Sequence, residues 1–519
     1  NVKAGNNYLH PRLEFKILCE CRFDCARMKF EISKNNVQNY ALPDSVDLGP
    51  LDGVLVLIGL ACLFSSNPAE SLFAIAQLKL LLRAYWRKGL PPVVLMLFLI
   101  PWLEISTSIF EANLRQETLN AMLHGSGRAA YWCSSIGLVA VHAGAYPFFR
   151  RHKNHNYESL KSSATKISLP KAIGLYFLIL LTTNSIAGFL GWGSSLYQIV
   201  TYFNQISQVL LIVICCRQAL LNELNATFIV FLLIVLGSSF YSFFSDWRIL
   251  LFAVFIAFGT IQKLTLTAVK RGLFIAIVFG NILYVWQGIK PIYRAYLVTG
   301  KVAVRGDIGS QAVNVSRSEA LTTFFALSRD FYFDESETYL FDNTTENTFY
   351  ATLRRIGYLE FMSLTMNRVP EVLDHEKGDL LQSNLTYALI PRILNPTKST
   401  KDDGSKVEKY ANFMVADSAS FSLGHYVEYY IDYGKSGMQV LLFLFGVLGG
   451  CILLLSYRSA TIQSPLFHIG LVFVLLQAWG SFQNDAIFVF GATFFGCLCH
   501  IFIFRPVYII LIKLSASNS

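Results

Sequence analysis

His425 and Glu428 lie three residues apart, directly before an apolar segment, and their types and spacing suit proton transfer. On a helix, positions i and i+3 share one face, so both side chains would reach one substrate at the membrane surface. A histidine or a carboxylate can accept the proton of an attacking hydroxyl group. We therefore expect a general base here. The alternative is structural: a buried, hydrogen-bonded histidine and a glutamate that stabilises the start of the helix.

Arginines in the same half of the chain suit a second task, the binding of phosphate groups. A guanidinium group stays charged and donates planar, bidentate hydrogen bonds, which match a diphosphate. The first candidate is Arg392, which follows a proline. The further candidates for substrate binding are Arg305, Arg248, Arg354, Arg355 and Lys398.

Each of these basic residues also has a structural interpretation. Arg392 can simply be solvated or extend to the membrane surface. Arg305, Arg354 and Arg355 can each form a salt bridge with an acidic residue on a helix face. Arg355 in particular can pair with Glu360 or another nearby acid. Arg248, at the outer end of an apolar segment, can anchor that end in the interface as readily as it can bind a ligand.

The elements that must position these residues are apolar segments of membrane-spanning length. Of the 519 residues, 54% are hydrophobic and 15% are charged, whereas soluble domains carry about 25% charged residues. Apolar runs of about 18 residues or more predict transmembrane helices, because a bilayer requires every backbone polar group to be paired within its segment. The predicted fold class is an all-α polytopic membrane protein.

We expect twelve spans, with eleven as the alternative, because the second run contains Gln77 and Lys79 and can lie in the interface instead. The runs cover approximately residues 51–66, 69–86, 91–112, 130–149, 170–191, 197–216, 225–244, 248–262, 272–289, 437–456, 464–482 and 485–505. The predicted organisation is a polar N-terminal extension (1–50), transmembrane helices 1–9 (51–289), a large external loop (290–436), transmembrane helices 10–12 (437–505) and a cytoplasmic tail (506–519).

The distribution of basic residues predicts the orientation. The net charge is +9, and short connectors around residues 83–88, 150–171 and 263–271 are rich in basic residues, whereas the opposite short loops carry only Arg115, Arg128 and Arg248. The positive-inside rule assigns these connectors to the cytoplasm, so residues 290–436 lie outside and both termini inside. No basic stripe with interleaved aromatic residues is present, and we expect no nucleic-acid partner. The Cys19, Cys21 and Cys25 group lacks a fourth ligand and a common zinc spacing, so we expect no metal.

Two segments of the long loop carry a pattern of prolines, glycines and charged residues. The first contains Pro391, Arg392, Leu394, Pro396 and Lys398, with Asn395, Thr397 and Ser399 as departures from the pattern I-P-R-x-L-W-P-D-K-P. The second contains Gly424, Glu428, Tyr430, Gly434 and Gly437, with Asp432 and Tyr433 as departures from G-x-x-x-E-x-Y-x-N-F-G-x-x-G. Together with the dozen spans and the large loop in the C-terminal third, these segments resemble the bacterial oligosaccharide repeat-unit polymerases, the Wzy-type O-antigen polymerases.

The resemblance, which does not extend to residues 1–50, implies a GT-C-like architecture and a metal-independent glycosyltransferase without a cofactor. Such an enzyme joins undecaprenyl-diphosphate-linked oligosaccharides into O-antigen, capsule or exopolysaccharide at the periplasmic face of the bacterial inner membrane. The bilayer, a chain-length regulator and a flippase are the further partners that it suggests.

Two alternatives stay open. An O-antigen ligase or oligosaccharyltransferase of the same architecture differs only in its acceptor. A transporter or flippase of the lipid-linked unit is disfavoured, because the sequence has neither an internal repeat nor a run of charges at the middle of the membrane.

Overall fold

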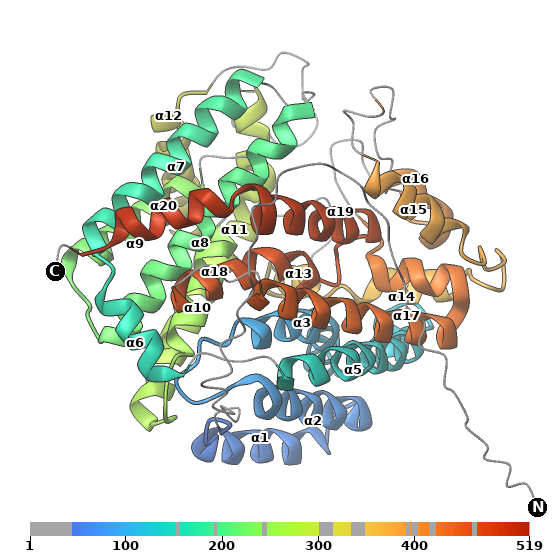
Figure 1. Ribbon diagram of the computed structural model, residues 1–519. Helices are drawn as coiled ribbons and strands as arrows, with labels where there is room; N and C mark the ends of the chain where they lie inside the picture. The colour runs from blue at the N-terminus through green and yellow to red at the C-terminus, as the bar shows by residue number, and fades with distance from the viewer. Residues whose placement is uncertain are drawn as a thin grey trace, which may run out of the picture. The chain divides into compact units, whose positions relative to one another are not determined.

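A computed structural model describes residues 44–151, 156–190, 195–240, 247–299, 315–333, 348–390, 395, 403–414, 422–458 and 464–517. In these ranges the chain is mainly helical, and β-type pairing is limited to the isolated bridges between Ser45 and Arg87 and between Ile167 and Ala516. The all-α prediction is confirmed for this part of the chain (Figure 1).

The helices of the N-terminal half are α1 (Gly49–Cys62), α2 (Pro68–Tyr85), α3 (Val93–Leu114), α4 (Leu119–Met122), α5 (Gly127–Arg151), α6 (Tyr157–Thr165), α7 (Leu169–Leu190), α8 (Ser195–Leu221), α9 (Ala226–Ser239), α10 (Trp247–Phe258) and α11 (Leu266–Thr299). Those of the C-terminal half are α12 (Arg317–Phe333), α13 (Thr348–Ile356), α14 (Leu359–Met366), α15 (Asp379–Leu389), α16 (Asp403–Ala411), α17 (His425–Arg458), α18 (Pro465–Leu476), α19 (Ala486–Cys497) and α20 (Arg505–Ser515). A 3-10 turn (Gln477–Trp479) follows α18, and a π-helical stretch (Leu498–Ile503) continues α19.

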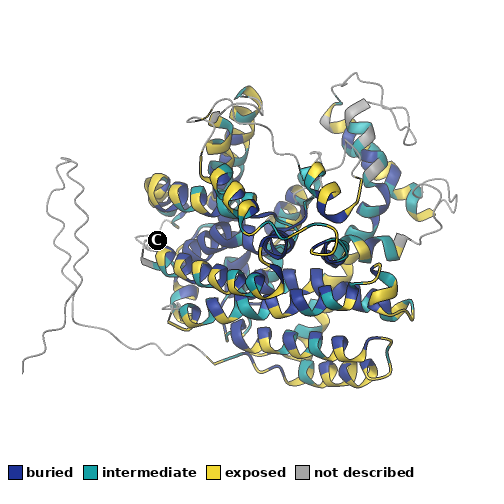
Figure 2. Ribbon diagram, turned by 90° about the vertical axis from the view of Figure 1, so that its right-hand side faces the viewer, coloured by how far each residue is buried: buried dark blue, intermediate teal, exposed yellow. Residues whose placement is uncertain are grey.

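Several of these helices are suited to a bilayer. Among the described residues, six helical segments are long and apolar enough to cross a membrane: α3, α7, α8, α11, α17 and α19 with its π-helical continuation. Their outward faces carry exposed apolar side chains, such as Leu181 and Phe189 of α7 and Phe274 of α11. Figure 2 shows exposed residues on the outward faces of helices and buried residues between them. Exposed apolar surface on this scale indicates a lipid environment, so the chain is a helical protein with membrane-spanning features.

Among the described helices, α5 and α17 make the most extensive contact, and glycines make their close approach possible (Figure 1). A Cβ atom on Gly144 of α5 would lie 2.2 Å from the carbonyl oxygen of Phe443. A Cβ atom on Gly446 of α17 would lie 2.1 Å from the carbonyl oxygen of Val141. Membrane helices use small residues in this way, because close backbone contact replaces a hydrophobic driving force that is absent in lipid.

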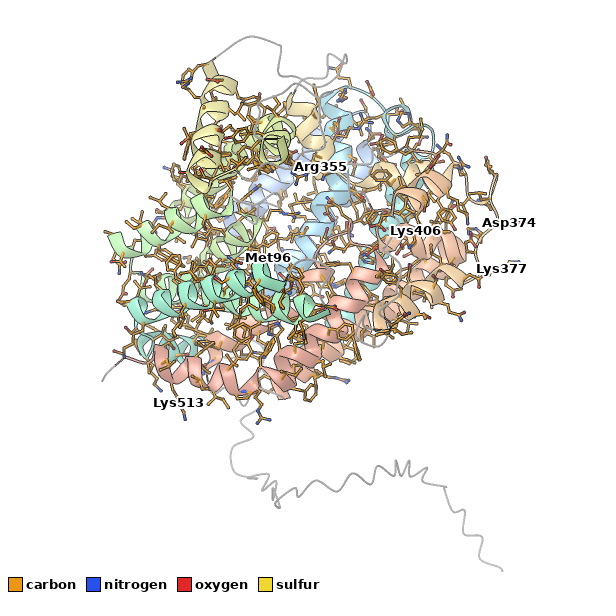
Figure 3. All side chains as sticks on the ribbon, turned by 90° about the horizontal axis from the view of Figure 1, so that it is seen from above. Met96, Arg355, Asp374, Lys377, Lys406 and Lys513 are labelled. Atoms are coloured by element: carbon orange, nitrogen blue, oxygen red, sulfur yellow. The ribbon has the colours of Figure 1, made fainter. Side chains whose placement is uncertain are left out.

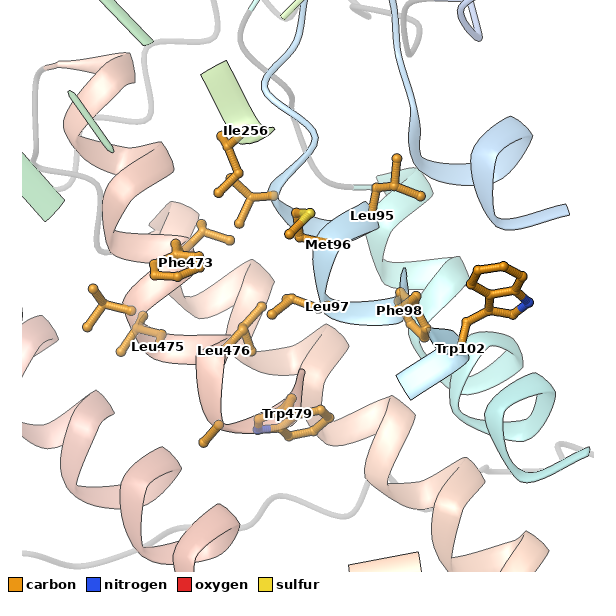
Figure 4. Close-up of a cluster of buried hydrophobic side chains, with 14 of the residues drawn as sticks. Leu95, Met96, Leu97, Phe98, Trp102, Ile256, Phe473, Leu475, Leu476 and Trp479 are labelled. Carbon is orange, nitrogen blue, oxygen red and sulfur yellow. The ribbon is translucent and has the colours of Figure 1, made fainter. Parts of the chain in front are cut away.

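The apolar core continues from this pair to α3 and α18. Figure 4 shows Leu97 of α3 beside Leu476 of α18, and Phe98 of α3 on the side of Trp102. The indole N–H of Trp479 donates a hydrogen bond of 2.8 Å to the hydroxyl of Thr493 in α19. The buried polar end of this side chain therefore has a partner inside the bundle.

The connectors that the sequence assigns to one side of the membrane lie together. The amide of Gly89, after α2, donates to the carbonyl of Ile261, after α10, at 2.9 Å. Gly89 also lies against the ring of Tyr157 at the start of α6. The amide of Ser168 donates to the carbonyl of Ser515 at the end of α20, at 2.8 Å. We call this the basic end of the bundle, and it agrees with the predicted grouping of basic loops.

Helices α12 to α16 occupy the stretch predicted as a long external loop, and they lie toward the opposite end. Helix α3 starts near the basic end, and its far half contacts α13. The apolar spacing over residues 350–369 suits one amphipathic helix, but the chain forms two helices, α13 and α14, with a break at Gly357 and Tyr358. A Cβ atom on Gly357 would lie 2.8 Å from Oγ of Ser108. The break thus lets the backbone lie directly on α3.

Candidate anion-binding site

Four basic side chains converge at the end of the bundle opposite the basic end. Arg248 lies in the first turn of α10, Lys290 and Arg294 lie four residues apart on α11, and Arg355 lies in the last turn of α13. Lys290 is within electrostatic range of all three arginines, and Arg294 interacts with both Arg248 and Arg355. We call these four residues the cation cluster.

An aromatic cluster fixes the helices that carry these cations. Trp247, Ile289 and Tyr293, which each directly precede a member of the cation cluster, are all buried in this second apolar core. The Tyr293 hydroxyl donates to the carbonyl of Phe240 at 2.7 Å. Because α11 continues beyond Lys290 to Thr299, Lys290 and Arg294 at positions i and i+4 present two cations on one face. The apolar packing therefore positions the charges at the edge of the bundle.

Electrostatics at the cation cluster favour an anionic ligand. Burial lowers the pKa of the Arg355 guanidinium, and the charge of Arg248 acts in the same direction. Burial, followed by the charges of Arg355 and Arg248, likewise lowers the pKa of Arg294. Arginine remains charged at neutral pH after such shifts, since its ordinary pKa is above about 12. Lys290, Arg294 and Arg355 are partly buried, whereas Arg248 is exposed. Like charges held close together repel, and a multivalent anion would relieve that repulsion.

An acidic side chain of α3, the helix next to α13, lies near the cation cluster. Glu104 of α3 is 6% exposed, and the charge of Arg248 acts on it. Its Oε1 accepts a hydrogen bond from Ser481 Oγ at 2.9 Å, and its Oε2 accepts one from the Phe482 amide at 2.5 Å. The Glu104 carboxylate is thereby held by the turn after α18.

The two adjacent arginines of α13 have different surroundings. Arg354 forms hydrogen bonds of 3.1 Å and 2.5 Å with the carboxylate of Glu360, which also lies 3.5 Å from Nε2 of His124. The expectation that Arg355 pairs with Glu360 is therefore wrong, since Arg354 takes that position and Arg355 turns toward the cation cluster. Figure 3 shows Arg355 well away from Lys513 of α20 at the basic end. Within the described part of the chain, neither Arg248 nor Lys290 forms an ion pair with a carboxylate.

His425 and Glu428 share a buried face of α17 and contact the start of α19. The Glu428 carboxylate accepts a hydrogen bond from the Ala486 amide at 2.8 Å and lies 3.5 Å from Lys406 Nζ. His425 Nδ1 lies 2.8 Å from the carbonyl oxygen of Asn484. Its buried Nε2 has no hydrogen-bond partner among the described residues. The expected shared face is present, and the role of either residue in proton transfer stays a prediction.

Aromatic rings connect these residues with the cation cluster. The ring of Tyr358, whose hydroxyl interacts electrostatically with Arg355, lies 6.2 Å from the ring of Phe482. Phe482 in turn lies 4.6 Å from Tyr426, the neighbour of His425. Burial raises the pKa of Tyr358, so this hydroxyl stays protonated at neutral pH.

Other residues of the second sequence pattern have structural contacts. The carboxylate of Asp432 accepts hydrogen bonds from the amides of Leu381 at 2.7 Å and Leu380 at 3.1 Å, at the start of α15. Gly434 interrupts α17 with a φ of +67°, a backbone conformation that favours glycine. The Tyr430 hydroxyl donates to the carbonyl of Val369 at 2.7 Å.

The remaining predicted substrate-binding residues, Arg392, Arg305 and Lys398, lie outside the described residues, as do the three cysteines near the N-terminus. Conversely, sequence reasoning missed Lys290 and Arg294 and left Glu104 and Glu111 without a role. Glu111 pairs with Arg115 at 2.8 Å. The spacing of Lys290 and Arg294, one helical turn apart beyond the end of an apolar run, is the signal that would have identified them.

The bundle and its cation cluster define a helical protein with several potential membrane spans and a cluster of basic side chains at one end. Residues 127–459 match the family described as Domain of unknown function (DUF8712), and because the match covers more than half of the chain, the chain belongs to that family. The matched segment contains all four members of the cation cluster. No curated protein and no solved structure shows a significant match to the chain.

Proposed function

We propose that the protein is a glycosyltransferase whose donor is a glycan linked to a lipid diphosphate. The diphosphate binds at the cation cluster, and the glycan is transferred to an acceptor glycan. The observation that carries the proposal is the convergence of Arg248, Lys290, Arg294 and Arg355 at the end of the bundle opposite the basic end. A lipid diphosphate presents its anionic group at the membrane surface, where these cations lie. The resemblance of the second sequence pattern to the repeat-unit polymerases supports the same donor.

The reaction would proceed with a diphosphate as the leaving group. The hydroxyl oxygen of an acceptor glycan forms a bond to the anomeric carbon of the donor, and the bond from that carbon to the diphosphate oxygen breaks. The lipid diphosphate leaves with the electron pair, and its developing charge is stabilised by the arginines. The proton of the acceptor hydroxyl passes to a base, for which His425 and Glu428 are the candidates.

The finer architecture belongs to the same proposal. Twelve spans, a GT-C-like arrangement and a bacterial inner-membrane location would place α12 to α16 in the periplasm and the basic end in the cytoplasm. The assignment of the basic connectors to the cytoplasm rests on the positive-inside rule. The variants Ser328→Cys on α12 and Ser162→Cys on α6 test this topology. A thiol reagent that does not cross the membrane is added to intact cells, and only Ser328→Cys is expected to react.

Two adjacent arginines give a matched test of the site. We expect Arg355→Gln to weaken the binding of a fluorescent polyprenyl diphosphate about tenfold or more, since a hydrogen bond between charged groups contributes about 1.5–3 kcal/mol. Arg354→Gln removes the same charge from the same helix. Because the Arg354 side chain bonds Glu360, its loss should change the binding of the polyprenyl diphosphate little. Equal effects of both variants, or no effect of Arg355→Gln, would contradict the proposed site.

A reconstituted assay tests the reaction. The purified protein is incubated with one lipid-diphosphate-linked repeat unit, and the products are separated by size. A ladder of longer glycans without another acceptor supports the polymerase. Product formation only after addition of lipid A-core or a protein acceptor would instead identify a ligase or oligosaccharyltransferase. Movement of the intact unit across a liposome membrane without chain extension would identify a transporter.

A further inference from the structure

Helix α12 packs against α11, although it belongs to the stretch predicted as an external loop. The ring of Phe324, in the first half of α12, lies 5.7 Å from the ring of Tyr293. The ring of Phe331, in the second half, lies 5.2 Å from the ring of Tyr284. Because later residues of α12 meet earlier residues of α11, the two helices run antiparallel. Helix α12 therefore runs back from the cation cluster toward the basic end.

A glycine and an asparagine of α11 receive the end of α12. A Cβ atom on Gly288 would collide with the ring of Phe331, so the missing side chain leaves room for that ring. The hydroxyl of Tyr332 donates a hydrogen bond of 3.1 Å to the side-chain oxygen of Asn281. The side-chain nitrogen of Asn281 donates to the carbonyl of Ile277 at 2.8 Å. A polar side chain in an apolar helix thus has partners for both of its polar atoms, as membrane helices require.

The position of Asn281 along α11 sets the depth of this contact. Residues Leu266–Lys290 of α11 form one of the segments that are long and apolar enough to cross a membrane. An α-helix rises about 1.5 Å per residue, so Asn281 lies about 13 Å deeper in this segment than Lys290 at its end. The hydrocarbon core of a bilayer is about 30 Å thick. The hydroxyl of Tyr332 therefore lies at a depth that belongs to the bilayer.

The last two residues of α12 present large aromatic side chains outward. The exposed fraction is 52% for Tyr332 and 82% for Phe333. One turn before Phe333, the exposed Arg329 forms an ion pair of 2.9 Å with Asp330. Aromatic rings next to an arginine are typical of the membrane interface, where the rings enter the apolar region and the guanidinium group extends to the headgroups. The end of α12 therefore suits a lipid surface.

We propose that α12 is a re-entrant helix whose end is anchored in the bilayer leaflet next to the cation cluster by Tyr332 and Phe333. The hydrogen bond from Tyr332 to Asn281 holds this end against α11. The chain does not cross the membrane here, because α13, the next described helix, carries Arg355 of the cation cluster. The partner of this surface is the bilayer itself. The anchor uses none of the residues assigned to the glycan donor and does not depend on the reaction.

Fluorescence quenching of the full chain in liposomes tests the anchor. A bimane label is attached to Phe333→Cys, and the signal of the unmutated chain, treated in the same way, is subtracted because the chain has cysteines of its own. The label should lose most of its fluorescence in liposomes of brominated phosphatidylcholine and little with iodide, which stays in water. Phe274→Cys, on an exposed position of α11, is the positive control for lipid. Thr322→Cys, on an exposed position in the first half of α12, is the matched control for water.

A second variant tests the hydrogen bond that holds the helix. Tyr332→Phe removes the hydroxyl that pairs with Asn281 and should increase iodide quenching of the label at position 333. Unchanged quenching would overturn the role of this bond. Iodide quenching at position 333 as strong as at position 322 would overturn the anchor, since the end of α12 would then lie in water. Protection from both quenchers would overturn the bilayer as the partner, because protein would cover the surface instead.

Discussion

The backbone amide of Tyr358 donates a hydrogen bond of 2.9 Å to the carbonyl oxygen of Glu104. This bond joins the chain between α13 and α14 to the middle of α3, while the carboxylate of the same glutamate binds the turn after α18. Arg355, three residues before Tyr358, is thereby placed relative to α3. The position of Arg355 in the cation cluster therefore depends on a contact with a residue that lies far away in sequence.

Glu104→Ala should destabilise the protein by about 2–4 kcal/mol, because the buried amide of Phe482 and the hydroxyl of Ser481 lose their acceptor, and each unsatisfied buried group costs about 1–3 kcal/mol. Glu104→Gln keeps one side-chain acceptor and should cost less. Thermal unfolding in detergent, followed by circular dichroism, measures both changes. Equal stability of the alanine and glutamine variants would show that these hydrogen bonds contribute little.

Asp432→Ala should destabilise the start of α15 by about 1–2 kcal/mol, the usual effect of losing a side chain that accepts from the first amides of a helix. Asp432→Asn retains an acceptor oxygen and should lose much less. Hydrogen exchange of the amides of Leu380 and Leu381 reports the change directly. Unchanged exchange in Asp432→Ala would contradict the capping role.

Gly446→Ala should destabilise the α5–α17 pair by about 1–3 kcal/mol, the range for overpacked sites, because its new methyl group would lie 2.1 Å from the carbonyl oxygen of Val141. Gly174 of α7 is the matched control, since a Cβ atom there meets no atom within 4 Å. Gly174→Ala should be neutral or stabilise by up to about 1 kcal/mol. Thermal unfolding of both variants measures the difference, and similar midpoints would contradict the packing argument.

Acid should loosen α16 through Glu376. Hydrogen bonds from Lys409, at 2.7 Å, and from Tyr410, at 2.5 Å, lower the pKa of Glu376. A carboxylate with a lowered pKa stabilises the folded state above its unfolded value of about 4.3, and this contribution disappears as the pH falls through the lowered pKa. Protease sensitivity of α16 should therefore rise below about pH 4.

The control for this prediction is a neighbouring acid. Glu376→Gln should remove most of the acid dependence of protease cleavage at α16, whereas Glu408→Gln, on an exposed position of the same helix, should leave it in place. High salt should weaken the effect, because the Lys409 side chain is 52% exposed and its charge is screened. Identical pH profiles for wild type and Glu376→Gln would contradict the assignment.

The sequence predicted the helical class and two of the four members of the cation cluster. Apolar runs are a local signal, and Arg248 and Arg355 were recognisable from residue type and position. Lys290 and Arg294 were missed because the ninth span was ended at residue 289, whereas α11 continues through Pro291 to Thr299. A membrane helix tolerates an internal proline when neighbouring helices support it.

Long-range contacts account for the rest of the difference. The partners of Glu104 lie more than 370 positions away, and no local pattern identifies such a pair. His425 and Glu428 were correctly expected to share a face, but their contacts with Asn484 and Ala486 come from tertiary packing. The break between α13 and α14 has the same origin, since it depends on how Gly357 lies on α3.

The hydrogen bonds of two buried carboxylates define how large a piece of the chain can fold by itself. Glu428 lies inside the matched segment, 127–459, but its partner amide at Ala486 lies beyond it. Glu104 and Phe482 lie outside that segment on opposite sides. An isolated fragment of residues 127–459 would contain the Glu428 carboxylate without its donor, the Ala486 amide. It would also lack α3, which lies beneath Arg355. We therefore expect the family segment to fold as part of a larger cooperative unit and not as an autonomous domain.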